Sequence, residues 1–378
     1  MNQIYKLRIV MLLTILMLTI SVNLAAQQTY NIYFGNIHAH TSYSDGTKDS
    51  LKSGVKTPKQ AYAYAKQTEH LDFLGISEHN HKQAGMKKLA NFAKGVAQAK
   101  AATVKDKFVA LYGMEYGVIK NGGHVLIYGI DQLIGWEKDN YDIFNAQYDY
   151  TTLFKLIADS PNAFATLAHP EPTHFNNLKG NPYSDTADRA IVGVSIATGQ
   201  FDSKVTDYSI KRPLAFYAYY THMLAKGYIV GPTMDHDNHN TTFGRHTASR
   251  TAVLAKSLTK EDIIDAYRNN RFYATQDWNA KVDFTINAEP MGSYIKGSSI
   301  LNIKASLFDE DPNDKISKIE LWYGVPGSGI APKKLSTSTN DSLSSTVELP
   351  QGKYYYYFLK FTQLDGDVIV TSPIWAKN

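Results

Sequence analysis

Histidines and carboxylates stand at the ends of apolar segments along the first two thirds of this sequence. The apolar run 31–37 is followed directly by His38 and His40. Because side chains two positions apart on a strand point to the same side, these imidazoles are placed to bind one metal ion. The pair alone is weak evidence, since 12 histidines in 378 residues give about 0.4 such pairs by chance.

The same arrangement recurs at five further segments, and the recurrence carries the weight. The segments read SEH (77–79), ME (114–115), GGH (122–124), AHP (168–170) and DHDNH (235–239). So many buried, unpaired ionisable groups would cost several kcal/mol each, and bound cations offset that cost. Neutral imidazoles together with carboxylates suit Zn, Mn or Fe. The sequence therefore predicts a centre that holds more than one divalent metal ion.

These residues lie in a region, from about 30 to 275, where apolar runs alternate with helix-like segments. Helices are expected from the capping box at Thr57 toward His70, and at 86–104, 151–159, 213–226 and 259–270. Strands are expected at 31–37, 72–77, 108–114, 125–130, 164–168, 191–196 and 228–232. Repeated β-then-α units favour a parallel α/β barrel, in which active-site residues stand at the carboxyl ends of the strands.

At these motifs the sequence resembles the polymerase and histidinol phosphatase (PHP) superfamily, and most of all its exported CehA/McbA-like metallohydrolase branch. The matching stretches follow the family's order: HAHTSYSDG (38–46), DFLGISEHN (72–80), GMEYG (113–117), GGHVLIYG (122–129), LAHP (167–170) and DNH (237–239). The resemblance implies a distorted (β/α)7 barrel that holds two or three divalent metal ions.

The resemblance also implies three ligand sets, in which Glu115 bridges two ions. The sets are His38, His40, Glu115 and Asp237; Glu115, His124 and His169; and Asp45, His79 and His239. Asp235 and His236 offer another register for the last motif, whereas the Asp-x-His spacing of the family favours Asp237 with His239. Glu78 stands where many members have Asp, and we expect it to orient a ligand.

Three residues are candidates for contact with substrate. His174, in the loop after His169, and His246 are each expected to protonate a leaving oxygen. Arg245 either binds a phosphate or is a solvated loop residue. The other histidines have structural interpretations: His81 in a loop, where contact with substrate is a lesser alternative, His70 at a helix end and His222 in helix packing.

After about residue 280, short alternating apolar runs replace the helices. They predict a small all-β, Ig-like sandwich. Its strands are expected at 282–286, 301–307, 319–323, 347–349, 354–361 and 368–370. The predicted organisation of this α/β protein is therefore a signal peptide at 1–26, a metallohydrolase barrel at 27–280 and a sandwich at 281–378.

The N-terminal segment is typical of an export signal. Lys6 and Arg8 precede a largely apolar run, 9–20, and Ala25 and Ala26 precede two polar residues. The run is shorter than the roughly 20 residues that span a membrane. We therefore expect an exported protein, periplasmic or secreted, with no stable membrane span after cleavage; an uncleaved anchor is the alternative.

Composition narrows the function further. The chain has no cysteine, which excludes thiolate metal sites and disulfides. The net charge of +4 becomes 37 − 35 = +2 without Lys6 and Arg8, so nucleic acid is not an expected partner.

The predicted activity is hydrolysis of a small-molecule phosphate ester, in which a metal-bridging hydroxide attacks. Two alternatives stay open. One is hydrolysis of an amide, carbamate or carboxylic ester at the same site, and the other is an exported, non-catalytic binding protein that contains metal.

Overall fold

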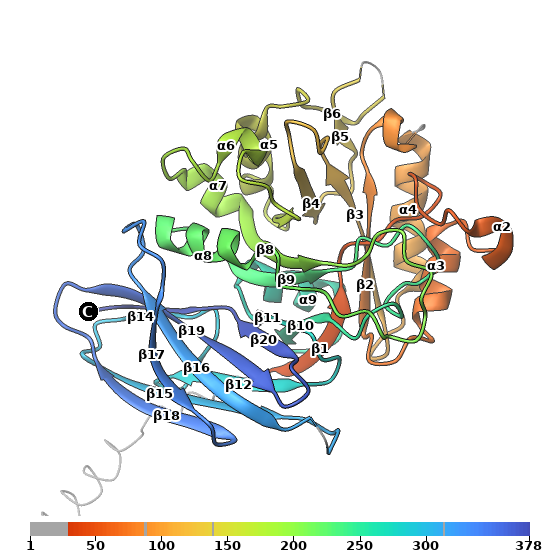
Figure 1. Ribbon diagram of the computed structural model, residues 1–378. Coiled ribbons are helices and arrows are strands. Elements are labelled where there is room, and N and C mark those ends of the chain that lie inside the picture. The colour runs from red at the N-terminus through yellow and green to blue at the C-terminus, as the bar shows by residue number, and fades with distance from the viewer. Residues whose placement is uncertain (1–28, 87–88, 138–139, 313) are drawn as a thin grey trace, which may run out of the picture. The chain divides into compact units, whose positions relative to one another are not determined.

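The computed structural model describes residues 29–86, 89–137, 140–312 and 314–378, and the expected export signal at 1–26 lies outside these ranges. Residues Asn31–Asn378 group into one unit. Its fold is mixed α/β, with a large mixed sheet and a β-rich C-terminal portion (Figure 1). Within the described ranges, no helix has both the length and the apolar character needed to cross a membrane.

Seven strands of the large sheet form a ring. In ring order they are β1 (Asn31–Asn36), β2 (Phe73–His79), β3 (Val109–Tyr116), β4 (His124–Tyr128), β7 (Phe164–Ala168), β8 (Ile191–Thr198) and β9 (Gly231–Asp235). Each corresponds to one of the strands predicted from the sequence. Five of them, β2, β3, β4, β7 and β9, are buried along their whole length, which explains why they read as continuous apolar runs.

One ring strand runs against its neighbours, which corrects the expectation of a parallel barrel. β4 is antiparallel to both β3 and β7, whereas β1–β2–β3 and β7–β8–β9 are parallel. The connection 117–123 is too short for the crossover of a dozen or more residues that parallel neighbours need. The reversal brings His124, the first residue of β4, to the end of the ring where the parallel strands finish.

The ring closes where the segment after β1 meets the segment after β9. Ala39 and Asn238 form a parallel bridge. The amide of His40 donates to the carbonyl of Asn238 (3.2 Å), and the amide of Asp237 donates to the carbonyl of His38 (2.9 Å). Closure therefore runs through residues that the sequence predicts to be metal ligands.

The helices cover the ring, and each predicted helix is present. They are α2 (Ser50–Ser53), α3 (Pro58–Ala65), α4 (Leu89–Ala102), α5 (Tyr150–Ala158), α6 (His174–Asn177), α7 (Asp185–Ala190), α8 (Tyr217–Lys226) and α9 (Lys260–Arg268), with a 3-10 turn, η1, at Lys82–Ala84. The predicted helix 86–104 includes residues 87–88, which lie outside the described ranges. The capping box at Thr57 and Gln60 is formed.

His70 does not end a helix, contrary to expectation. α3 finishes at Ala65, and His70 has a left-handed backbone (φ 47°) with its ring 5.1 Å from the ring of Trp278. The polar residues that follow Ala65 leave no apolar face to continue the helix.

Two strands that the sequence did not predict extend the sheet beyond β1. β10 (Arg250–Ala255) pairs antiparallel with β1, and β11 (Phe272–Thr275) pairs antiparallel with β10. β11 also pairs with β20 (Val368–Thr371), so the large sheet continues into the C-terminal portion (Figure 1). β5 (Ile134–Gly135) and β6 (Ile143–Phe144) form a separate two-stranded sheet.

The C-terminal portion contains all six strands predicted there. The remaining strands are β12 (Lys281–Ile286), β13 (Glu289–Pro290), β14 (Tyr294–Lys296), β15 (Ile300–Phe308), β16 (Ile316–Gly324), β17 (Lys333–Ser338), β18 (Ser342–Glu348), β19 (Tyr354–Gln363) and β21 (Ile374–Lys377). β13, β12, β15 and β18 form one sheet, and the others join the large sheet. Since segments 27–280 and 281–378 share a sheet, their division into two domains stays a prediction.

Candidate metal centre

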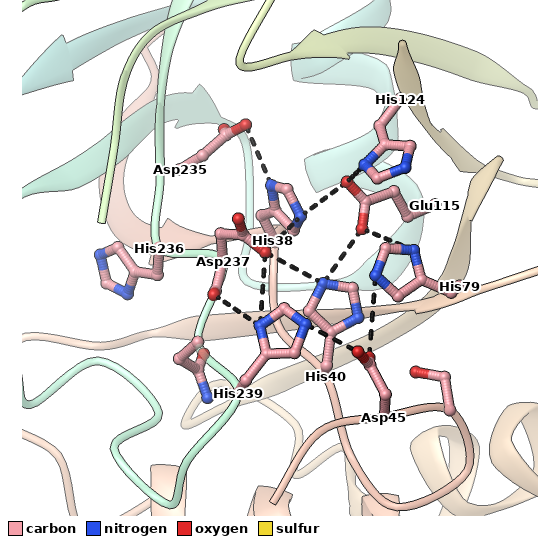
Figure 2. Close-up of polar contacts among 12 residues, drawn as sticks. His38, His40, Asp45, His79, Glu115, His124, Asp235, His236, Asp237 and His239 are labelled. Atoms are coloured by element: carbon pink, nitrogen blue, oxygen red, sulfur yellow. Dashed lines mark hydrogen bonds and ion pairs between the residues drawn. The ribbon is translucent and has the colours of Figure 1, made fainter. Parts of the chain in front are cut away.

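All nine predicted ligands lie at one end of the ring, and Figure 2 labels eight of them, all but His169. His38 and His40 follow β1, with Asp45 in the next loop; His79 ends β2; Glu115 is near the end of β3; His124 begins β4; His169 follows β7; and Asp237 and His239 follow β9. Ile37 and Ala39, which alternate with the first two histidines, pack into the apolar cores. We call these nine residues the ring-end cluster.

Glu115 lies at the centre of the ring-end cluster and contacts five imidazoles. The contacts join its Oε1 to His38 Nε2 (3.2 Å), His124 Nδ1 (2.7 Å) and His169 Nε2 (3.1 Å), and its Oε2 to His40 Nε2 (3.1 Å) and His79 Nδ1 (3.2 Å). A carboxylate has only about four lone-pair sites, and Glu115 is fully buried. This carboxylate is therefore placed to bridge cations rather than to accept hydrogen bonds alone.

Two further carboxylates complete the cluster. Asp237 Oδ1 lies 3.2 Å from Nε2 of both His38 and His40. Asp45 Oδ1 lies 3.2 Å from His239 Nε2 and 3.7 Å from the Nε2 of His79. Carboxylate oxygens thus face imidazole nitrogens on each side of Glu115 (Figure 2).

Three sets of ligand atoms are compact enough to share an ion, with all atoms of a set within 4.8 Å of one another. The sets are His38, His40, Glu115 and Asp237; His79, Glu115 and His124; and His40, Asp45, His79 and His239. The first set is the one that the resemblance implies for the first ion. The second has His79 in place of His169, and the third adds His40. His169 still contacts Glu115, as given above.

Unpaired buried atoms show that the cluster fits divalent metal ions. Among the described residues, seven buried atoms of the cluster have no hydrogen-bond partner: His38 Nε2, both ring nitrogens of His40, Asp45 Oδ1, His79 Nδ1, Glu115 Oε2 and His124 Nδ1. Most of them face an opposite ligand atom at 2.7–3.2 Å without hydrogen-bond geometry. Two ligands about 2.1 Å from one ion, at roughly a right angle, lie about 3.0 Å apart. Imidazole and carboxylate donors without thiolate suit Zn, Mn or Fe.

The electrostatics follow from the same contacts. Burial alone raises the pKa of Glu115, but His124, His38 and His79 lower it well below its usual range. Burial likewise raises the pKa of Asp237, and His38 and His40 lower it well below its usual range. The balance is reversed for His40, where burial lowers the pKa but Asp237 and Glu115 raise it to about 9. These shifts favour the ionised form of both carboxylates and the positively charged form of the His40 ring between them.

Asp235 and His236, the other register that the sequence offers, make contacts outside the nine-residue cluster or behind it. Asp235 Oδ2 lies 3.2 Å from His38 Nδ1, and Thr233 donates to its other oxygen (3.2 Å). His236 turns its Nε2 to the carbonyl of Ser249 (2.7 Å). Asp235 therefore orients His38 so that Nε2 faces the cluster (Figure 2).

Glu78 positions the loop between two predicted ligands. Its buried carboxylate accepts hydrogen bonds from the amides of Thr41 (3.1 Å) and Ser44 (3.2 Å) and from both of their hydroxyls. His40 precedes this loop segment and Asp45 follows it. Glu78 thus acts on the ligands through the backbone.

Two predicted ligands have strained backbones. His169 (φ 28°) and Asp237 (φ 51°) are non-glycine residues in the left-handed region, a conformation that costs about 1–3 kcal/mol and concentrates at functional sites. For Asp237, the hydrogen bond to the carbonyl of His38 that closes the ring holds this conformation in place.

Part of the cluster is exposed to solvent. The side chains of His38, His40 and Glu115 are fully buried, whereas those of Asp45, Asp237 and His169 are 33%, 15% and 13% exposed. An approaching molecule therefore meets the cluster at these exposed ligands, which we call its open side.

Two residues that sequence reasoning missed flank the open side. Lys48 Nζ lies 3.8 Å from Asp45 Oδ2 and 5.7 Å from the ring centre of Phe201. Phe201 is exposed, and its ring lies 5.8 Å from that of His239. Lys48 could have been predicted from the sequence, because it stands three residues after Asp45. Nothing in the sequence around Phe201 indicates its position near the cluster.

Of the three predicted substrate residues, His174 packs next to a predicted ligand. It lies beside Gly123, the residue before His124, where an added Cβ would stand 2.7 Å from the Cβ of His174, and burial mainly lowers its pKa. Its Nδ1 accepts from the amide of Glu171 (3.1 Å).

The other two predicted substrate residues are engaged elsewhere. Arg245 donates to Thr68 Oγ1 (3.2 Å) and the carbonyl of Gln67 (2.9 Å) and lies over the ring of Tyr64 (4.4 Å). His246 is fully buried, and its ring packs 4.9 Å from that of His236. The structure therefore does not bring either side chain to the open side of the cluster.

The remaining histidines have local contacts. His81 is buried and stacks on Trp136 (5.4 Å between ring centres). His222, in α8, directs its Nε2 to the carbonyl of Lys179 (3.1 Å). Packing accounts for both.

A scan against models of protein families finds no match for this chain, and a search of curated proteins finds none either. Among solved structures, a lesion-specific endonuclease from Pyrococcus furiosus, PfuEndoQ, is similar over 63% of this chain and 56% of its own length, with 13% identity and a TM-score of 0.36. Superoxide reductase (neelaredoxin) from Ignicoccus hospitalis is similar over 26% of this chain and 80% of its own, with 15% identity and a TM-score of 0.21.

Fibronectin(III)-like modules of CbhA from Clostridium thermocellum are similar over 26% of this chain and 96% of their own length, with 18% identity and a TM-score of 0.19. Similarities at this level carry no functional argument, so the function is argued from the geometry of the cluster.

Proposed function

We propose that this protein is a metal-dependent hydrolase of the PHP superfamily that cleaves phosphate esters of small molecules. The observation that carries the proposal is the position of Glu115, a buried carboxylate contacted by five imidazoles. Structural metal sites are closed by protein ligands. The partial exposure of Asp45, Asp237 and His169 supports catalysis over a non-catalytic binding role.

In this proposal the ring-end cluster holds two or three divalent ions, with Glu115 shared between them. Such ions polarise a phosphoryl oxygen and supply a water molecule of lowered pKa. Asp235 keeps His38 in the orientation that binds, and Glu78 keeps Asp45 near His79 and His239 by fixing the loop 41–44. These contacts hold the metal-binding atoms in position before any ion binds.

Lys48 and His174 are the proposed contacts with substrate. The ammonium of Lys48 stands on the open side, where it would pair with an anionic ester oxygen. Because Nδ1 of His174 accepts a hydrogen bond from the amide of Glu171, the proton of the neutral ring is on Nε2. That N–H is then able to donate a hydrogen bond to the leaving oxygen as negative charge develops there. Arg245 and His246 have no part in the proposal, because their contacts lie elsewhere.

We propose further that the protein is exported, periplasmic or secreted, and that nucleic acid is not its substrate. The support comes from the sequence: the basic and apolar pattern of residues 1–26 and the near-neutral balance of 37 − 35 charges after that segment.

A substrate panel on purified protein tests the proposal. The panel contains a phosphomonoester, a phosphodiester, a carboxylic ester and a single-stranded oligonucleotide, with metal content measured on the same sample. Turnover of a small phosphate ester is expected in wild type and in Glu289→Gln, which changes an exposed carboxylate on β13. It should be lost in Glu115→Gln. Turnover of the carboxylic ester alone would change the proposed substrate class from phosphate esters to carboxylic esters. Absence of any turnover in metal-loaded protein would refute the proposal that the protein is a hydrolase.

A further inference from the structure

A second group of oxygen ligands lies where the ring sheet joins the C-terminal strands. Asp277, between β11 and β12, meets Asp309 and Asp314 from the connection between β15 and β16. One oxygen atom from each lies within 4.8 Å of the others. Gln363, the last residue of β19, reaches the same point. We call these four residues the junction cluster; it contains no histidine and shares no residue with the ring-end cluster.

Gln363 is crowded by more acceptors than it has hydrogens. Its Nε2 lies 2.9 Å from Asp277 Oδ2, 2.8 Å from Asp309 Oδ2 and 3.2 Å from the carbonyl of Asp314. An amide nitrogen carries only two hydrogens. Meanwhile Oε1 of the same amide is buried and has no hydrogen-bond partner among the described residues, and Gln363 is only 1% exposed.

A neighbouring amide repeats this pattern. Asn279 is buried, its Nδ2 donates to Asp311 Oδ2 (3.1 Å), and its Oδ1 has no partner. The side chain of Gln363 thus touches the acidic group directly, and that of Asn279 touches Asp311, which lies between Asp309 and Asp314 in the chain. An amide's oxygen and nitrogen are interchangeable in shape, so rotating Gln363 places an oxygen among the three acidic oxygens.

The carboxylates here lack basic partners. Within the described residues, neither Asp277, Asp309 nor Asp314 forms an ion pair with a lysine or arginine. Lys211, the nearby cation, pairs with Asp365 (2.8 Å) and Asp367 (2.7 Å) instead. Burial first, and then the neighbouring Asp277, raise the pKa of Asp309 to about 7, because its ionised form is desolvated and faces another carboxylate. A cation would remove that repulsion.

We propose that the junction cluster binds one Ca²⁺ ion, with Gln363 turned so that Oε1 faces the ion. Donors that are all oxygen, drawn from carboxylates, an amide and a backbone carbonyl, suit a hard cation, and irregular protein-only donor sets suit Ca²⁺ better than Mg²⁺. The ion would tie the segment after β11 to the β15–β16 connection and to the end of β19 (Figure 1). Its role would be to hold the C-terminal strands against the ring sheet.

Calcium titration of the purified protein, with its ring metals retained, tests this proposal by calorimetry and thermal unfolding. The expected result is one Ca²⁺ bound per chain and a rise in Tm of a few degrees at saturation, with a smaller rise in Mg²⁺. The double variant Asp309→Asn, Asp314→Asn should lose the rise. Without calcium, it should be as stable as wild type or more so, because the variant relieves repulsion. Asp283→Asn, at an exposed position on β12, is the matched control and should keep the rise.

Glu115→Gln separates this site from the ring-end cluster and should also keep the calcium-dependent rise in Tm. No calcium binding by wild type, or a rise that persists in the double variant, would overturn the proposal. Loss of the rise in Glu115→Gln would assign the calcium to the ring instead. Equal stabilisation by Mg²⁺ would overturn the choice of ion.

Discussion

The ring-end cluster and the junction cluster both gather carboxylates, but their other donors differ. Six of the nine ring-end residues are histidines, and every one lies at or just after the end of a strand, or at the start of the reversed strand β4. The junction cluster has carboxylates and an amide, supplied by loops and one strand end. Imidazoles favour transition metals that activate water, whereas oxygen donors favour a hard, structural ion. The type of donor atoms, more than the number of acidic residues, thus distinguishes the proposed catalytic site from the proposed structural site.

The largest effect is expected at the bridging carboxylate. Glu115→Gln removes the charge that five imidazoles face. Loss of a residue that only supports a metal ligand costs up to about 100-fold. Because Glu115 is itself a proposed ligand, kcat/KM should fall by more than that. Circular dichroism should show a retained fold, and Glu289→Gln should keep wild-type kcat/KM. If Glu115→Gln kept kcat/KM within tenfold of wild type, the ring-end cluster would not be the catalytic one of the two clusters.

A smaller effect is expected at Asp235, which contacts a predicted ligand but is not one itself. Asp235→Ala removes the partner of His38 Nδ1 and should cost about 10–100-fold in metal affinity or kcat/KM. Added metal should restore part of the rate, because the ligands themselves remain. A competition titration with a chromophoric chelator measures the affinity. Unchanged affinity would mean that Asp235 does not orient His38.

Lys48 sharpens the substrate side of the comparison. Lys48→Met keeps an unbranched side chain of nearly the same length but removes the charge beside Asp45. KM for an anionic phosphate ester should rise about tenfold, equivalent to roughly 1.4 kcal/mol, with little change in kcat. Steady-state kinetics on anionic and neutral esters measure the difference, and an equal effect on both would exclude a charge contact.

The smallest effect is expected where the two sites should be independent. Asp309→Asn alters the junction cluster only, so kcat/KM at 25 °C should stay within about twofold of wild type, as for a distant site without shared partners. Saturating calcium should not change kcat/KM either. A large loss of activity in Asp309→Asn would show that the two sites are coupled.

Much of the ring was predictable because its strands are buried on both faces. Runs such as FLGISEH in β2 and VALYGMEY in β3 leave no other interpretation than buried strand. The ends of those runs also placed the histidines and carboxylates. The reversal of β4 was missed, although the short connection 117–123 already excluded a crossover.

What the sequence did not predict depends on contacts between distant segments. Arg245 and His246 follow the last motif directly, but their side chains bond to Gln67 and Thr68 and pack on His236. The members of the junction cluster stand far apart in sequence, at 277, 309, 314 and 363, and each lies in a segment typical of a turn or strand end. The pairings of β12 with β15, of β16 with β19 and of β11 with β20 bring those segments together.

Metal analysis of wild type and Glu115→Gln, purified side by side, tests the central claim most directly. We predict two or three divalent transition-metal ions per wild-type chain, and a content in Glu115→Gln that is lower by at least one ion, because Glu115 is placed to bind two of them. Equal metal content in the two proteins, or no transition metal in an active wild-type protein, would contradict the bridging role of Glu115.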